Sequence, residues 1–151
     1  METTKGRIKA ISISKEKGTK KYNVPTARLK ADFGMEGDAH AGDWHRQVSL
    51  LAEESIAKMR AKGATVTSGD FAENITTEGI DLQSLTIGSK LRLGSIAEVE
   101  ITQFGKKCHS GCAIFQQIGD CIMPREGVFA KVTKPGQVKT GDTIEVLNSN
   151  D

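Results

Sequence analysis

Proline is scarce in this sequence, and its charges nearly cancel. Only 3 of the 151 residues are proline, and neither repeats nor low-complexity stretches are present, so few positions qualify as linkers. A chain of this length fits one domain that buries about 70% of its unfolded surface. The 21 Lys and Arg residues against 19 Asp and Glu give a net charge of +2, which gives no case for bulk attraction to nucleic acid or membranes. We expect neither as a partner.

Long apolar runs are also missing. Residues 1–20 lack the uninterrupted apolar stretch of a signal peptide, and no window approaches the ~20 apolar residues that span a bilayer. We therefore expect a cytoplasmic protein. In that reducing compartment cysteines persist as thiols, metal ligands or redox groups rather than as structural disulfides.

The β-forming segments are short. Glycines recur at intervals of roughly ten to fifteen residues through the second half of the chain, as turn residues do between short strands. The expected strands cover residues 8–13, 22–29, 47–51, 71–76, 90–93, 98–102, 128–133 and 143–147. The first two are expected to pair as a hairpin.

Helices are expected in few places. Residues 53–63 start with acidic and end with basic side chains before Gly63, an order that suits the helix dipole. Ser110–Ile118 is a second, shorter candidate. We predict a mainly β domain with one or two short helices, in which the strands form a closed or partly open barrel. This domain covers residues 1–147, and residues 148–151 form a disordered tail.

All three cysteines lie in one segment, KKCHSGCAIFQQIGDC, from Lys106 to Cys121. An odd number leaves one thiol unpaired. Cys108 stands between Lys107 and His109, and a neighbouring cation favours the thiolate over the thiol. We therefore predict a reactive sulfur at Cys108, with buried packing as the alternative.

The other two cysteines allow several interpretations. Cys112 lies one helical turn after Cys108 if the segment is helical, so it could act as a resolving thiol, and Cys121 could return to the same place. A zinc or iron–sulfur site that includes His109 or His40 is a second interpretation, but the spacing fits neither common zinc nor ferredoxin motifs. Inert packing is the third.

Two histidines, His40 and His45, lie in the glycine-containing loop HAGDWH. They lack the helical spacing of zinc enzymes, so a catalytic metal in this loop is not expected. A histidine in such a loop more often hydrogen-bonds the backbone and orients its neighbours.

Several segments, taken in order, resemble one known family. They read FGMEGDAHAGDWHRQVSLL (Phe33–Leu51), GDFAENITTEGIDL (Gly69–Leu82), IGSKLRLG (Ile87–Gly94), ITQFGKKCH (Ile101–His109) and GVFAKVTKPGQVKTGD (Gly127–Asp142). Together they resemble the MOSC domain, named for the C-terminal part of molybdenum cofactor sulfurases. The resemblance covers nearly the whole chain and is that of a stand-alone bacterial type.

This resemblance implies a β-barrel that binds a molybdopterin-type cofactor or handles sulfur for it. Cys108 occupies the position of the family's functional thiol, where it would carry a persulfide, without pyridoxal phosphate, or bind molybdenum. A phosphate-bearing pterin needs cationic and polar contacts. The candidates for these contacts are Arg46, Lys107, Arg125, Lys131, Asn74, Glu73 and His40.

Three functions stay open. The favoured one is a molybdenum cofactor-binding or sulfur-carrier domain, which as an enzyme would be a sulfur transferase acting on the cofactor. A molybdenum-dependent reductase is the second and a zinc-stabilised regulatory or interaction domain the third. The expected partners are a molybdopterin-type small molecule and a molybdopterin-synthesis protein or cysteine desulfurase.

Overall fold

The computed structural model describes residues 5–16, 21–63, 65–71, 73–105 and 126–147. The predicted helix at Ser110–Ile118 and the predicted tail at residues 148–151 lie outside these residues. Among the residues described, no helix has the length and apolar character that crossing a membrane requires.

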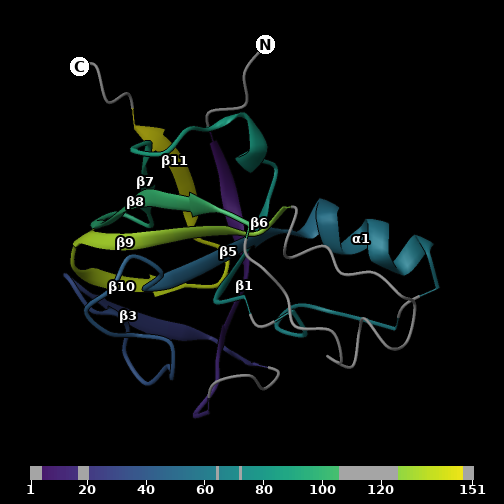
Figure 1. The fold of residues 1–151 in the computed structure, drawn as a ribbon, viewed down its shortest axis with the longest axis horizontal. Helices are drawn as coiled ribbons and strands as arrows, with labels where there is room; N and C mark the ends of the chain where they lie inside the picture. The colour runs from purple at the N-terminus through teal and green to yellow at the C-terminus, as the bar shows by residue number, and fades with distance from the viewer. Residues whose placement is uncertain (1–4, 17–20, 64, 72, 106–125, 148–151) are drawn as a thin grey trace.

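Seven strands close into a β-barrel (Figure 1). Their order around the barrel is β11-β7-β8-β9-β5-β6-β1, and pairing between β11 and β1 closes the ring. The strands are β1 (Lys5–Ile13), β5 (Val48–Ala52), β6 (Ile75–Glu78), β7 (Lys90–Leu93), β8 (Ala97–Phe104), β9 (Val128–Lys134) and β11 (Thr143–Leu147). All neighbours are antiparallel except β5 and β6, which run parallel. The mainly β barrel predicted from the sequence is confirmed.

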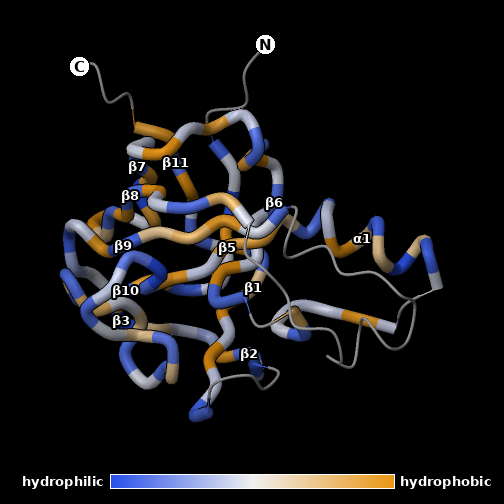
Figure 2. Tube along the Cα trace, viewed as in Figure 1, coloured by the Kyte–Doolittle hydropathy of each residue, from blue (hydrophilic) through white to orange (hydrophobic). Residues whose placement is uncertain are grey.

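The barrel interior holds the main hydrophobic core. Because side chains alternate between the two faces of a strand, every second residue of a barrel strand points inward. Ile11, Leu50, Ile75, Val99 and Val132 are fully or almost fully buried in this core. Hydrophobic residues accordingly recur along β5 and β9 (Figure 2).

The segment predicted as one strand at residues 22–29 is divided at Pro25. Strand β2 (Tyr22–Val24) pairs with β1 as the predicted hairpin. Strand β3 (Thr26–Lys30) leaves for a second sheet with β4 (Gly34–Met35) and β10 (Gly136–Lys139). Proline has no N–H to donate to a sheet, so it marks the point where the chain changes partners.

One α-helix, α1 (Glu53–Ala61), packs beside the barrel with Ile56 and Met59 fully buried. It confirms the predicted helix, and it ends before Gly63, whose φ of 101° suits glycine. A short 3-10 helix, η1 (Leu82–Ser84), follows β6 and is capped by the Asp81 side chain.

The strand predicted at residues 71–76 agrees with the structure only at its last two positions, because β6 begins at Ile75. The polar side chains before it hydrogen-bond to backbone instead. Glu73 accepts from the Gly69 N–H, and Asn74 accepts from the Ser49 N–H. Such bonds favour a loop over a strand.

Candidate functional site

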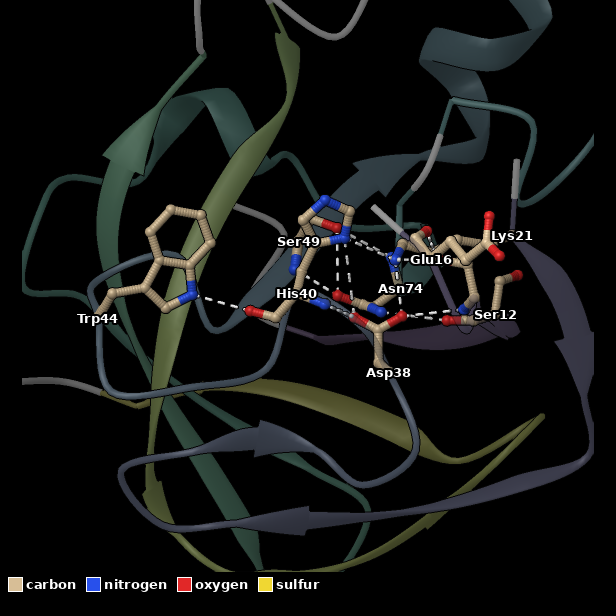
Figure 3. Close-up of polar contacts among 9 residues, drawn as sticks. Ser12, Glu16, Lys21, Asp38, His40, Trp44, Ser49 and Asn74 are labelled. Atoms are coloured by element: carbon tan, nitrogen blue, oxygen red, sulfur yellow. Dashed lines mark hydrogen bonds and ion pairs between the residues drawn. The ribbon is translucent and has the colours of Figure 1, made fainter. Parts of the chain in front are cut away.

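A buried polar cluster lies on the outside of the barrel, over β1, β5 and β6 (Figure 3). On these strands Ile11, Leu50 and Ile75 face the barrel core. Their sequence neighbours face outward and are nevertheless buried: Ser12, Ser49 and Asn74. The loop between β4 and β5 supplies Asp38 and His40, and the segment between β1 and β2 supplies Ser14 and Lys21.

Lys21 stands at the centre of this cluster. Its side chain has no exposed surface, and its Nζ donates to three acceptors: Asp38 Oδ1 at 2.6 Å, His40 Nδ1 at 3.0 Å and Ser14 Oγ at 3.2 Å. An ammonium group has three hydrogens and no lone pair, so Lys21 is the donor in each of these contacts. We call Ser14, Lys21, Asp38 and His40 the Lys21 cluster.

Asp38 is the buried counter-charge of Lys21. Burial, the largest single effect, would raise the pKa of this carboxyl, and the hydrogen bond and positive charge of Lys21 are the main effects that lower it. Hydrogen bonds from the Ser14 N–H and the Asn74 side chain act in the same direction, and the pKa is held below its ordinary value of 3.8. Asp38 is therefore ionised at neutral pH.

His40 is the member of the Lys21 cluster that reaches the surface, with its side chain 25% exposed. Its backbone is fixed on both sides. The His40 N–H donates to Asp38 Oδ2 at 3.2 Å, and Trp44 Nε1 donates to the His40 carbonyl at 2.8 Å (Figure 3). The loop therefore holds the imidazole in one place.

Asn74 ties the cluster to the barrel strands. Its Oδ1 accepts from the Ser49 N–H at 3.0 Å and its Nδ2 donates to the Ser12 carbonyl at 3.1 Å. Both ends of its amide are thus used within the chain. The predicted contact between Asn74 and a cofactor stays a prediction, and the observed bonds give the side chain a framework role.

Glu73 is fully buried below the same surface. Its Oε2 accepts from the Gly69 N–H at 2.9 Å and from Thr76 Oγ1 at 2.8 Å, while its Oε1 has no hydrogen-bond partner among the described residues. Burial raises the pKa of this carboxyl above its ordinary value of 4.5, and the hydrogen bonds offset only part of that rise. Its predicted contact with a cofactor also stays a prediction.

Arg46 lies at the other end of the same loop. Its guanidinium stacks over the Trp44 ring at 4.5 Å and the Phe129 ring at 5.5 Å. Its Nε is buried and, in the part of the chain that the structure describes, has no hydrogen-bond partner. The two rings hold the Arg46 cation in place, and its buried Nε stays an unsatisfied donor, which carries an energetic cost.

The Arg46 region adjoins the strand ends that flank the cysteine segment. Thr102 Oγ1 donates to the His45 carbonyl, and His45 Nε2 lies 2.8 Å from Gln103 Oε1. Gln103 Nε2 then donates to the Gly105 carbonyl at 2.7 Å. The Gly105 N–H in turn donates to the Gly127 carbonyl at 2.7 Å, so β8 and β9 stay paired up to the described ends.

Several predicted site residues lie outside the described residues: Lys107, Cys108, His109, Cys112, Cys121 and Arg125. Their predicted roles stay predictions. Lys131 is described, and it lies on β9 opposite Glu100 of β8. It shares its strand face with Phe129, two residues away, which places it on the same side of the barrel as Arg46.

The sequence did not identify Lys21 as a site residue. The loop motif HAGDWHR contains His40 and Arg46, but Lys21 comes from a separate segment and carries no local signal of burial. Its location depends on β1 pairing with β2, which brings residue 21 beside the loop.

A cleft of about 420 Å³ lies elsewhere, between α1 and η1. Its polar groups largely bind each other: Ser55 Oγ and Lys58 Nζ both donate to the Glu126 carboxylate. The cleft contains none of the residues predicted to contact a cofactor. Within the described residues, no group of three or more His, Cys, Asp or Glu side chains is arranged to hold a metal ion.

The sequence matches the family model of the MOSC domain over residues 36–145. This match confirms the resemblance that the sequence motifs indicated. No curated protein matches the sequence significantly.

Solved structures of bacterial proteins share the fold. The YuaD protein from Bacillus subtilis has a TM-score of 0.78 and 21% identity, covering 94% of this chain and 95% of its own. YiiM from Geobacillus stearothermophilus has a TM-score of 0.72 and 20% identity, covering 95% and 75%. YiiM from Escherichia coli has a TM-score of 0.66 and 19% identity, covering 94% and 70%. At these identities the likeness shows the fold alone.

Proposed function

Because this chain belongs to the MOSC domain family, we propose that it binds a molybdenum cofactor, with Arg46 contacting the cofactor's phosphate group. The family is associated with molybdenum cofactor binding and with cofactor sulfurases. That association sets the class of ligand, and the residues of this chain supply the contacts.

The single observation that carries the proposal is the state of Arg46. Leaving a buried donor without a partner costs about 1–3 kcal/mol, and the Arg46 Nε has none among the described residues. A phosphate oxygen would satisfy this donor once the side chains that cover the buried Nε move aside. Stacking on Trp44 and Phe129 holds the guanidinium in place before the ligand arrives. The residues present therefore fit an anionic, phosphate-bearing group.

Cys108 supplies the sulfur chemistry in this proposal. It is three residues beyond Gly105 in the sequence, and the Arg46 loop is bonded to the strand that ends there. When bound, the cofactor would supply a molybdenum centre, for which a thiolate is a suitable ligand.

Sulfur transfer through Cys108 needs no oxidant other than the donor persulfide. The Cys108 thiolate attacks the outer sulfur of a donor persulfide, a new S–S bond forms, and the donor thiolate leaves. A nucleophile of the acceptor then attacks the outer sulfur, and the Cys108 thiolate leaves in turn. The fitting donor is the persulfide of a cysteine desulfurase, and the fitting acceptor is a thiolate of a molybdopterin-synthesis protein, which receives the outer sulfur as its own persulfide.

Equilibrium binding of isolated molybdopterin tests the Arg46 contact. Loss of a charged hydrogen bond costs about 1.5–3 kcal/mol, so Arg46→Ala should raise the Kd about 10- to 150-fold. Arg46→Lys should recover only part of the affinity, because lysine keeps the charge but lacks the planar guanidinium. Pterin fluorescence titration measures the Kd of the unaltered chain, of Arg46→Ala and of Arg46→Lys.

The matched control is Arg28→Ala, which removes an exposed arginine on β3 and should leave the Kd unchanged. Equal affinity of Arg46→Ala and the unaltered chain would remove Arg46 from the site. Equal losses of affinity in Arg46→Ala and Arg28→Ala would show that the change in overall charge causes the effect.

Thiol labelling tests the role of Cys108 separately. A thiolate reacts where a thiol does not, so at mildly acidic pH an alkylating reagent should modify Cys108 first, and Cys108→Ser should abolish this reaction. Mass spectrometry of peptides identifies the labelled residue. Equal labelling of all three cysteines at that pH would contradict a special thiol.

A further inference from the structure

The ring of His40 receives a hydrogen bond from the ammonium group of Lys21, which can donate but cannot accept. Lys21 Nζ lies 3.0 Å from His40 Nδ1, and an ammonium group is a donor without any lone pair. Nδ1 must therefore be the acceptor. In a neutral imidazole the single proton then sits on the other ring nitrogen, Nε2.

The protonation state of Lys21 is itself fixed by Asp38. The two charged atoms lie 2.6 Å apart, and both side chains have no exposed surface. Neutralising either one would leave a buried charge unpaired, which is strongly unfavourable. Lys21 is thus held as a cation and keeps donating to Nδ1.

The backbone that carries the imidazole is fixed. The His40 N–H is bound to Asp38 Oδ2, and the His40 carbonyl is bound by Trp44 Nε1, so the Cα of His40 stays beside Lys21. Asp38 therefore acts twice, once on the backbone of His40 and once on the lysine that contacts its ring (Figure 3).

Stability alone does not explain such a cluster. A buried ion pair is often no more stabilising than a well-packed apolar pair of the same volume. What the pair adds here is orientation, because its lysine is directed at the one partly exposed member of the cluster.

We propose that Lys21 and Asp38 are positioning residues that fix His40 as the tautomer with hydrogen on Nε2. His40 then serves as a hydrogen-bond donor to an anionic or carbonyl group, not as a base and not as a metal ligand through Nδ1. That the recognised group belongs to a molybdopterin-type ligand rests on the proposed function, whereas the tautomer does not.

Nitrogen NMR of the ligand-free, full-length chain tests the tautomer directly. A long-range proton–nitrogen correlation spectrum distinguishes protonated from unprotonated ring nitrogens, and His40→Gln assigns the His40 signals among the three histidines. At neutral pH we expect an unprotonated Nδ1 and a protonated Nε2. A proton on Nδ1, or on both nitrogens, would overturn the proposal.

A double variant tests whether the ion pair is the cause. Lys21→Met alone strands a buried carboxylate and risks unfolding, so Lys21→Met is combined with Asp38→Asn, which removes both charges together. The His40 signals should then shift to those of a mixture of tautomers. Ser14→Ala removes another acceptor of Lys21 and the bond of the Ser14 hydroxyl to the Glu16 carbonyl, keeps both charges, and should keep the original spectrum. Unchanged His40 signals in a folded double variant would contradict the positioning role of Lys21 and Asp38.

Ligand binding tests the donor role apart from the tautomer. Loss of a neutral hydrogen bond corresponds to a Kd for molybdopterin about 2- to 12-fold higher in His40→Ala. His40→Gln keeps an N–H donor and should recover part of this loss. Unaltered affinity in His40→Ala would reject the donor role, whereas an unaltered chain that fails to bind molybdopterin would reject the proposed function and leave the tautomer result standing.

Discussion

At the scale of single residues, two buried carboxyl groups below the same surface behave in opposite ways. Asp38 has a cationic partner, so its pKa is lowered, whereas burial of Glu73 raises its pKa. The difference follows from the partner, because both side chains are buried and both accept hydrogen bonds. One carboxyl therefore stabilises the fold when ionised, and the other stabilises it when protonated.

Asp38 predicts a loss of stability in acid. A lowered pKa means that its contribution is present above the ordinary value of 3.8 and is lost as the pH falls through the lower folded-state value. Urea unfolding at a series of acidic pH values should show this loss in the unaltered chain. The double variant Lys21→Met with Asp38→Asn should lack that part of the decline, and an identical decline in both would contradict the assignment.

Glu73 predicts the opposite pH dependence. The folded state holds this proton more tightly than the unfolded state, so the free energy of unfolding should fall as the pH rises from 4.5 through the raised pKa. Glu73→Gln removes the titrating group and should flatten this part of the profile. Urea unfolding of both chains measures the difference. A Glu73→Gln profile that keeps the full slope would show that other groups produce it.

Only some residues of the candidate site could be identified from the sequence. The loop motif identified His40 and Arg46 as candidates, and the structure gives each a defined environment. The sequence could not identify Lys21, because a lysine is normally exposed and only the packing of three separate segments buries this one. The opposite states of the two carboxyl groups also depend on that packing.

At the scale of elements, the loop before β6 is fixed by a close approach of backbone. The Gly69 carbonyl accepts from the Lys21 N–H at 3.0 Å. Gly69 has a φ of 95°, and a Cβ there would lie 2.5 Å from the Lys21 carbonyl oxygen. Only glycine fits at this position without a shift of the segment that carries Lys21.

Gly69→Ala should therefore destabilise the fold through both strain and contact. The positive φ alone costs about 1–3 kcal/mol, and the contact with Lys21 adds to that cost. Gly88→Ala is the matched control, because its φ of 97° is similar but no atom lies within 4 Å of its added Cβ. Chemical denaturation should show a larger loss for Gly69→Ala. Equal losses of stability in the two variants would mean that the contact with Lys21 does not contribute to the cost.

The elements that the sequence predicted well are those with a clear local pattern. Strands β7 and β11 have the predicted bounds, because their segments are short, place apolar side chains between polar ones, and are bounded by glycine or polar residues. Strand β10 was missed: it is only four residues long with a single buried side chain. The predicted start of β6 was wrong because side-chain bonds of Glu73 and Asn74 replace strand pairing.

At the scale of the whole molecule, the barrel is made by pairings between distant parts of the chain. Strand β11 pairs with β1 near the opposite end of the sequence, and β9 lies between β8 and β5. Local patterns indicate strands but not this order, and the motif resemblance implied only that the strands form a barrel. The pairing of β5 with β9 brings the Arg46 loop beside β8 and β9, so the site is a consequence of the topology.

The most direct test of cofactor binding is native mass spectrometry of the chain isolated from cells that make the molybdenum cofactor. We expect a bound molybdopterin-type species on the unaltered chain and a clearly smaller bound fraction on Arg46→Ala, with Arg28→Ala unchanged. An unaltered chain that carries no pterin, even after incubation with the isolated cofactor, would contradict the proposed function.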